Sequence, residues 1–167
     1  MRIMLAQRLQ IFTGLLGVAA TIIMARYLPE RVATHFSFSG APNAWSSNLT
    51  NTIFFCAMFL VMNLLFLAIP WLLRKLPVSL INMPNRDYWL APERREQSVR
   101  RMGVYMAVFA VGMNLFMIAV ESTTFAANRS MVPLSPVSII AIGAAFFIFM
   151  ILWIIRFVRA FRLPANK

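Results

Sequence analysis

Four long apolar segments, separated by shorter polar ones, dominate the pattern of this chain. A helix needs about 20 largely apolar residues to cross the hydrocarbon core of a bilayer, with a range of about 17–25. Because lipid offers the backbone no hydrogen-bond partners, a spanning segment of this kind is expected to be helical. The pattern therefore predicts an all-α membrane protein, a single integral membrane domain over residues 1–167 with four transmembrane helices. The predicted spans, none of which contains a charged residue, are 9–25, 53–73, 102–120 and 137–155.

The first of these segments also has features of a secretory signal peptide. Arg2 and Arg8 precede it, and Val18-Ala19-Ala20 resembles a cleavage site. The apolar run nevertheless continues to Met24, so cleavage would leave apolar residues behind. We therefore expect a retained helix.

The basic residues are distributed unequally between the two sides of the predicted membrane. Lys and Arg accumulate in cytoplasmic loops, so their count in short loops predicts orientation. Both termini and the central loop fall on one side and hold 13, whereas the other two loops hold 3. We therefore expect an N-in/C-in topology with a short extended outer loop at residues 29–48. The 13 are Arg2, Arg8, Arg74, Lys75, Arg86, Arg94, Arg95, Arg100, Arg101, Arg156, Arg159, Arg162 and Lys167, and the 3 are Arg26, Arg31 and Arg129.

Composition agrees with a membrane protein. Apolar residues make up 60% of the chain, against about 45–50% in an ordinary soluble domain. The net charge of +11 would indicate nucleic acid in a soluble protein. Here the basic residues sit at the ends of apolar runs, so we expect anionic lipid headgroups as the partner and no nucleic acid. The single cysteine, Cys56, excludes a disulfide framework.

The outer loop contains the stretch "THFSFSGAPNAW", residues 34–45. Polar and aromatic residues alternate over residues 35–39, which predicts a short strand or extended arm with the phenylalanines on one side. Trp45 suits the level of the headgroups. We expect Gly40-Ala41-Pro42-Asn43 to turn the chain.

The central loop, "INMPNRDYWLAPERREQSVRR" at residues 81–101, has its own pattern. We expect a turn at Met83-Pro84-Asn85 and interfacial positions for Tyr88 and Trp89. Pro92 is typical of the first turn of a helix, which should run unbroken into the third span. Four arginines of this helix are expected to face anionic headgroups at about 1 kcal/mol each. They are Arg94, Arg95, Arg100 and Arg101.

Both loops resemble a known family. The stretch "LPERVATHFSFSGAPNAWSS" is similar to the signature of domain of unknown function 1648, which has Pro, a His followed by an aromatic residue, Gly, Pro and Trp. That domain also forms the N-terminal part of the immunity proteins of the sporulation-delay toxin system. The loop "LINMPNRDYWLAPERRE" is similar to stand-alone bacterial members with four spans, which implies the bacterial inner membrane. The matching positions are Pro29, His35, Phe36, Gly40, Pro42 and Trp45 in the outer loop and Pro84, Asn85, Tyr88, Trp89, Pro92, Arg94 and Arg95 in the central one.

The chain departs from this resemblance at two positions. The family often has Asp after the turn proline, where this chain has Asn43, and Lys shortly after the Trp, where it has Asn48. A role that needs a charge in this loop is less well supported as a result.

Candidate chemistry in the outer loops is sparse. His35 could respond to protons or bind a metal, but a metal site needs three or four ligands, and these loops otherwise offer only Glu30 and Glu121. We expect a structural His35, hydrogen-bonded to a loop carbonyl or to Glu121. The neighbouring serines lack a catalytic motif, so we expect no catalytic, metal-binding or cofactor-binding residues and no enzyme.

Two asparagines fall within the second and third spans. Asn63 and Asn114 lie at similar depths when counted from the outer ends. They could hydrogen-bond across the helices or line a polar pathway, and we favour the first because no charged residue accompanies them.

Two classes of function remain. The first is a non-enzymatic binding, immunity or signalling protein that uses the outer loop as an interaction surface for a protein or peptide. The alternative is a small carrier or an accessory subunit of a membrane transport complex. The sequence leaves open whether the chain forms a homo-oligomer.

Overall fold

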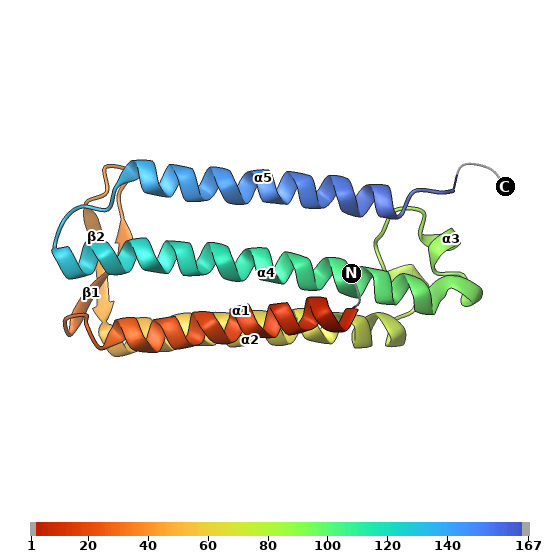
Figure 1. Ribbon diagram of the computed structural model, residues 1–167, viewed down its shortest axis with the longest axis horizontal. Coiled ribbons are helices and arrows are strands. Elements are labelled where there is room, and N and C mark those ends of the chain that lie inside the picture. The colour runs from red at the N-terminus through yellow and green to blue at the C-terminus, as the bar shows by residue number, and fades with distance from the viewer. Residues whose placement is uncertain (1–2, 165–167) are drawn as a thin grey trace.

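The computed structural model describes residues 3–164, and it is mostly helical. Four of its helices are long and apolar enough to cross a membrane, so that prediction is confirmed. A short antiparallel hairpin lies between the first two of them (Figure 1). The elements in order are α1 (Ile3–Ala25), β1 (Arg31–Phe36), β2 (Pro42–Ser47), α2 (Asn48–Lys75), the 3₁₀ turn η1 (Val78–Leu80), α3 (Arg86–Trp89), α4 (Pro92–Ser130) and α5 (Pro136–Ala160).

The long helices run side by side and give the molecule two distinct ends (Figure 1). At one end, here called the hairpin end, lie β1, β2 and the connection between α4 and α5. At the other, here called the α3 end, lie η1 and α3, and here α1 begins and α5 ends. The loops that carry the two sequence motifs are therefore at opposite ends of the molecule.

Local chemistry explains where the helices begin. Ser47 caps α2, since its Oγ accepts a hydrogen bond from the Thr50 amide at 3.0 Å. Pro92 and Pro136 occupy the first turns of α4 and α5, where a missing N–H costs nothing. As the sequence predicts, α4 begins at Pro92 and runs into the third span without a break.

Helix α4 is longer than its predicted span, because it continues past position 120 to Ser130. Its 39 residues extend about 58 Å at 1.5 Å per residue, well beyond a hydrocarbon core of about 30 Å. The expectation that residues 121–130 belong to a loop is wrong. In this extension the hydroxyls of polar side chains such as Thr124 bond to carbonyls of the preceding turn.

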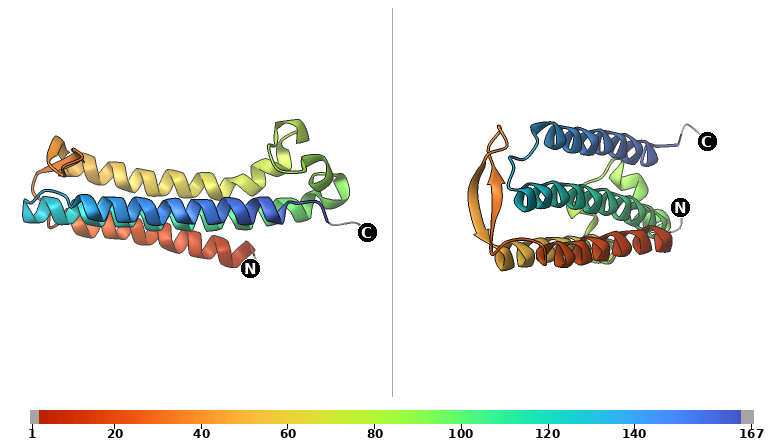
Figure 2. Two further views of the ribbon diagram at one scale, coloured as in Figure 1. Left: turned by 90° about the horizontal axis from the view of Figure 1, so that it is seen from above. Right: turned by 60° about the vertical axis from the view of Figure 1, so that its left-hand side comes forward.

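The helices do not form a symmetrical four-helix bundle. Helices α1, α2 and α4 pack against one another, whereas α5 packs along α4 and contains no buried residue (Figure 2). Stacked aromatic rings mediate much of the α4–α5 contact, including Phe116 with Phe146 and Phe109 with Phe149. The four long helices therefore form a three-helix bundle with a peripheral fourth helix. The reason is that α5 is apolar on all sides, which suits contact with lipid.

Candidate functional site at the hairpin end

The hairpin crosses the end of the helix bundle from α1 and α2 towards α5 (Figure 2). Its strands pair in register over Arg31 with Ser47, Val32 with Ser46 and Ala33 with Trp45, followed by irregular pairs. The turn lies at residues 37–41 rather than at 40–43, and the amide of Gly40 donates to Ser37 O at 2.9 Å. The predicted extended segment is present, but β1 ends at Phe36. The prediction that residues 35–39 are extended, with both phenylalanines on one side, is therefore wrong. Phe38 lies in the turn and is exposed.

One edge of this hairpin is completed by a side chain of α4. Ala33 N donates to Asn128 Oδ1 at 2.7 Å, and Asn128 Nδ2 donates to Ala33 O at 2.9 Å. The amide of Asn128 thus replaces the peptide group of a third strand beside β1. Both polar groups of the Ala33 backbone consequently point away from β2.

The opposite edge of the hairpin, on β2, is open. Antiparallel pairs alternate between hydrogen-bonded and non-hydrogen-bonded ones. Because the backbone N–H and C=O of Ala33 point away from β2, Ala33 and Trp45 form a non-hydrogen-bonded pair. Arg31 and Ser47, two residues away, form another non-hydrogen-bonded pair. The next pair along the ladder agrees with this alternation, since Asn48 N donates a hydrogen bond to Glu30 O at 2.7 Å. The backbone of Trp45 and the amide of Ser47 therefore point outward, and five of the six residues of β2 are exposed.

The turn of the hairpin is fixed by the α4–α5 connection. Leu134 N donates to Gly40 O at 2.9 Å, and Gly40 has a φ of 83°. A Cβ at this position would lie 1.9 Å from Leu134 O. Gly40 is therefore required both for its backbone conformation and for the close approach of Leu134.

The two asparagines at which the chain departs from the family resemblance both have partners. His35 Nδ1 lies 2.5 Å from Asn43 Oδ1, so the histidine bonds to a side-chain amide rather than to a backbone carbonyl or to Glu121. Asn48 Nδ2 donates to Ala25 O at 2.8 Å and so closes the end of α1. Asn43 and Asn48 therefore hold the loop together by hydrogen bonds.

Several exposed side chains gather on this hairpin. Phe38 is 91% exposed and Trp45 47% exposed, while Pro29 precedes β1 and Pro42 is the first residue of β2. The guanidinium of Arg31 lies 5.7 Å from the centre of the Trp45 ring. A cleft of about 490 Å³ lies between the hairpin and the start of the α4–α5 connection. It is lined by Arg31, Ala33, Phe36, Pro42, Trp45, Ala127, Asn128, Met131, Val132 and Pro133.

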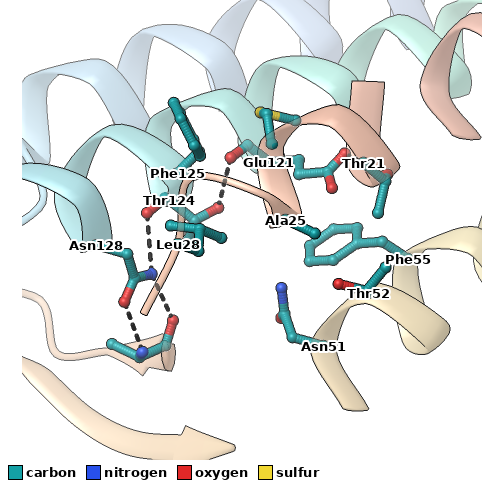
Figure 3. Close-up of a pocket in the computed structure, with 12 residues that line it drawn as sticks. Thr21, Ala25, Leu28, Asn51, Thr52, Phe55, Glu121, Thr124, Phe125 and Asn128 are labelled. Carbon is teal, nitrogen blue, oxygen red and sulfur yellow. Dashed lines mark hydrogen bonds between the residues drawn. The ribbon is translucent and has the colours of Figure 1, made fainter. Parts of the chain in front are cut away.

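Beneath the hairpin lies a small cavity that sequence reasoning missed (Figure 3). Its volume of about 20 Å³ suits a single water molecule. Glu121 lines it with only 5% of its surface exposed, and its carboxylate accepts a hydrogen bond from Thr21 Oγ1 at 2.9 Å. None of the ion pairs formed within residues 3–164 involves Glu121. The polar residues around it are Thr21, Asn51, Thr52, Thr124 and Asn128.

The cavity and the hairpin share one residue. Asn128 lines the cavity, and its side chain also donates to Thr124 O at 3.0 Å while binding Ala33 (Figure 3). No three His, Cys, Asp or Glu side chains come together among residues 3–164. What the cavity offers is one buried carboxylate among hydroxyls and amides, which can hold a proton or a polar solvent molecule.

Deeper in the bundle, the structure brings Asn63 and Asn114 together. Their amides donate to each other at 2.9 and 3.1 Å. Helix α1 joins them through Gln10, which donates to Asn63 O at 3.0 Å, and Thr13, which accepts from Asn114 Nδ2 at 2.9 Å. Gly14 makes room, since a Cβ there would lie 2.6 Å from Asn63 Nδ2. These polar contacts link all three helices of the bundle.

At the α3 end, the arginines of α4 bind protein groups. Arg95 donates to Leu76 O at 2.6 Å and so binds the carbonyl that follows α2. Arg94 lies over the Tyr88 ring at 4.1 Å from its centre. Only Arg100 is exposed, and it pairs with Glu96. Arg94 thus binds Tyr88 of the central loop, whereas Arg95 and Arg101 bind carbonyls at the ends of α2 and α5. Contact of these arginines with headgroups stays a prediction.

Glu96 lies on the part of α4 that precedes the apolar segment 102–120. Hydrogen bonds from Arg74 and then from Arg100 lower the pKa of this carboxylate to about 2. The ion pairs are largely exposed, so their contribution to stability is small.

The central loop also holds the end of α5. Asn85 Nδ2 and Trp89 Nε1 both donate to Phe161 O, at 2.7 and 2.8 Å, and Arg101 donates to Ala160 O at 2.8 Å. Asn85 adopts a left-handed conformation beside Pro84 in the predicted turn. Half-buried Trp89 packs edge-on against buried Phe161, and its interfacial position stays a prediction. Helix α5 is held at both ends, here and through Leu134.

These features define a mostly helical, multi-pass membrane protein with a structured hairpin. Residues 12–61 match the family model described as Domain of unknown function (DUF1648). The matched segment includes most of α1, the hairpin and the first half of α2, and the resemblance is confirmed over these residues. Comparison with curated proteins and with solved structures returned no match.

Proposed function

We propose that this chain is a non-enzymatic binding or signalling protein of the bacterial inner membrane, in which the hairpin end is the interaction surface. The observation that carries the proposal is the way the hairpin is held. Asn128 fixes β1, and Leu134 fixes the turn at Gly40. Exposed Phe38 and Trp45 are thereby presented on a supported scaffold. Aromatic residues displayed in this manner are typical of surfaces that bind other proteins.

In this proposal the termini and the α3 end face the cytoplasm, and the hairpin faces outward. The support is the uneven distribution of basic residues. Arg26, Arg31 and Arg129 lie at the hairpin end, whereas most other basic residues cluster at the α3 end. Arg2 and Lys167, which entered the count, lie outside the described residues. The exposed arginines of the α3 end would then meet anionic headgroups. An immunity role of the kind the family resemblance implies is one form of this proposal.

Photo-crosslinking tests the proposal. A photoreactive residue replaces Phe38 at the hairpin end or, as the matched control, exposed Gln97 at the α3 end. A protein captured only from position 38 is then purified and titrated against wild-type, Trp45→Ala and Gln97→Ala chains in nanodiscs. We expect Trp45→Ala to weaken binding at least tenfold and Gln97→Ala to leave it unchanged. Equal affinity for all three chains would contradict the proposal.

The Glu121 cavity favours a second candidate, a small carrier or an accessory subunit of a transport complex. A buried carboxylate within a membrane bundle is a typical feature of proton and ion pathways. In this case Glu121→Gln, which keeps the shape of the side chain, would abolish proton or Na⁺ uptake into proteoliposomes. Uptake that is absent from wild-type proteoliposomes, or equal for both chains, would remove this candidate.

A further inference from the structure

The two edges of the hairpin differ in their hydrogen-bond partners. On β1, Asn128 supplies both the acceptor and the donor that a neighbouring strand would supply to Ala33. On β2, the pairing pattern directs the N–H and C=O of Trp45 and the amide of Ser47 away from β1, and no turn, loop or side-chain hydrogen bond within residues 3–164 reaches these groups. An open strand edge is a template for pairing, and proteins commonly cover or blunt such edges. This chain covers one and leaves the other open.

We propose that the open edge of β2 binds an extended segment of a partner protein as a third, main-chain-paired strand. This inference rests on the proposed function and names its mode of recognition. The outward groups are the N–H and C=O of Trp45 and the N–H of Ser47. They are spaced two residues apart, as the pairing pattern of an added strand requires.

The side chains beside this edge indicate the chemistry of the segment. Arg31 and Trp45 are diagonal neighbours on one face of the hairpin, with the guanidinium 5.7 Å from the ring centre. Arg26 and Arg129 are also exposed at this end, against Glu30 as the exposed carboxylate. The surface therefore favours a segment with at least one acidic side chain facing Arg31. The cleft of about 490 Å³ beside Trp45 can accept an apolar residue of the same segment.

Ser47 permits a test of the main-chain bond alone. Ser47 has a φ of −68°, which a proline can adopt without strain. The N–H of Ser47 points away from β1. Ser47→Pro therefore removes one outward N–H without breaking the ladder. It also removes the hydroxyl that caps α2, and Ser47→Ala removes the same hydroxyl while keeping the N–H. The two variants therefore differ in the N–H that is proposed to bond to the partner strand, which only Ser47→Ala retains.

The probe is a set of ten-residue peptides selected from a random display library against the wild-type chain in nanodiscs. We expect selected peptides to contain acidic residues and to bind Ser47→Pro about five to ten times more weakly than Ser47→Ala, as the loss of one hydrogen bond requires. Bound peptide should also slow exchange of the Trp45 amide.

Equal affinity of a selected peptide for Ser47→Pro and Ser47→Ala, with an unprotected Trp45 amide, would overturn the edge inference. The proposed function would survive this result if Trp45→Ala still weakened binding of the crosslinked partner. A library without binders would overturn the inference as well. A Trp45 amide already protected in a peptide-free dimer would show that a second copy of the chain occupies the edge, contrary to the proposal.

Discussion

Asn128 and Ala33 are 95 residues apart in the chain, yet the side-chain amide of the first forms both hydrogen bonds of a strand neighbour with the backbone of the second. The contact connects α4 directly to β1. It also leaves β2 as the edge of the hairpin that faces outward.

Replacing Asn128 should therefore release β1 from the bundle. Asn128→Ala loses three hydrogen bonds to backbone groups, two to Ala33 and one to Thr124 O, and the groups at Ala33 are left without partners. We expect a loss of about 1–3 kcal/mol in the free energy of unfolding. Thermal unfolding in detergent micelles measures it, with exposed Ser122→Ala as the control on the same helix. Equal stability of the two variants would show that the contact has little weight.

Substitution of Gly40 tests the hairpin turn, and the same substitution at Gly143 on α5 serves as its control. Gly40→Ala places a Cβ 1.9 Å from Leu134 O at a φ of 83°, which should cost at least about 1–3 kcal/mol through strain and displacement. Gly143 lies on α5 with nothing within 4 Å of an added Cβ, so Gly143→Ala should be neutral or stabilise by up to about 1 kcal/mol. Unfolding in the same detergent compares them. A tolerated Gly40→Ala would mean that the turn and Leu134 are not in contact.

Arginines of α4 should differ in their effects according to their partners. Arg95→Gln removes charged donors from Leu73 O and Leu76 O, which should destabilise the chain by about 1.5–3 kcal/mol. Arg100→Gln removes an exposed ion pair and should cost less than about 1 kcal/mol. Denaturant titration of both variants measures the two losses in the free energy of unfolding. Similar small losses would instead favour lipid headgroups as the partner of Arg95.

The structure also determines where topology can be probed. Ser98 is buried and donates to Trp89 O at 2.6 Å, so a cysteine there would report burial instead of sidedness. In a Cys56→Ser background, cysteines at exposed Ser39 and Ser130 should react with an impermeant thiol reagent on intact spheroplasts, and one at exposed Gln97 only after lysis. Labelling of position 97 alone in intact spheroplasts would reverse the proposed orientation.

Part of this arrangement could be predicted from the pattern of residues. Asn63 and Asn114 stand out in apolar runs at similar depths, and the structure pairs them. Asn128 and Glu121 could not be placed on α4, because the sequence pattern predicts that the third span ends before Glu121, the first charge after its apolar run. The contacts of Arg95 and Trp89 depend on a loop that folds back on α2 and α5, and periodicity does not report such folding. Helix α5 is peripheral because the polar side chains that join the bundle lie on α1, α2 and α4, and their contacts could not be predicted from the sequence pattern of any one helix.

The most direct test of the account is hydrogen exchange at the hairpin amides of the lone chain in nanodiscs, without any peptide. Ala33, which donates to Asn128, and Val32, which pairs with Ser46, should exchange slowly. The amides of Trp45 and Ser47 should exchange much faster, and Asn128→Ala should accelerate Ala33 alone among the four. Exchange at Trp45 and Ser47 as slow as at Ala33 in a monomer would show that the edge is already covered, and it would contradict the proposal that β2 presents an open edge to a partner.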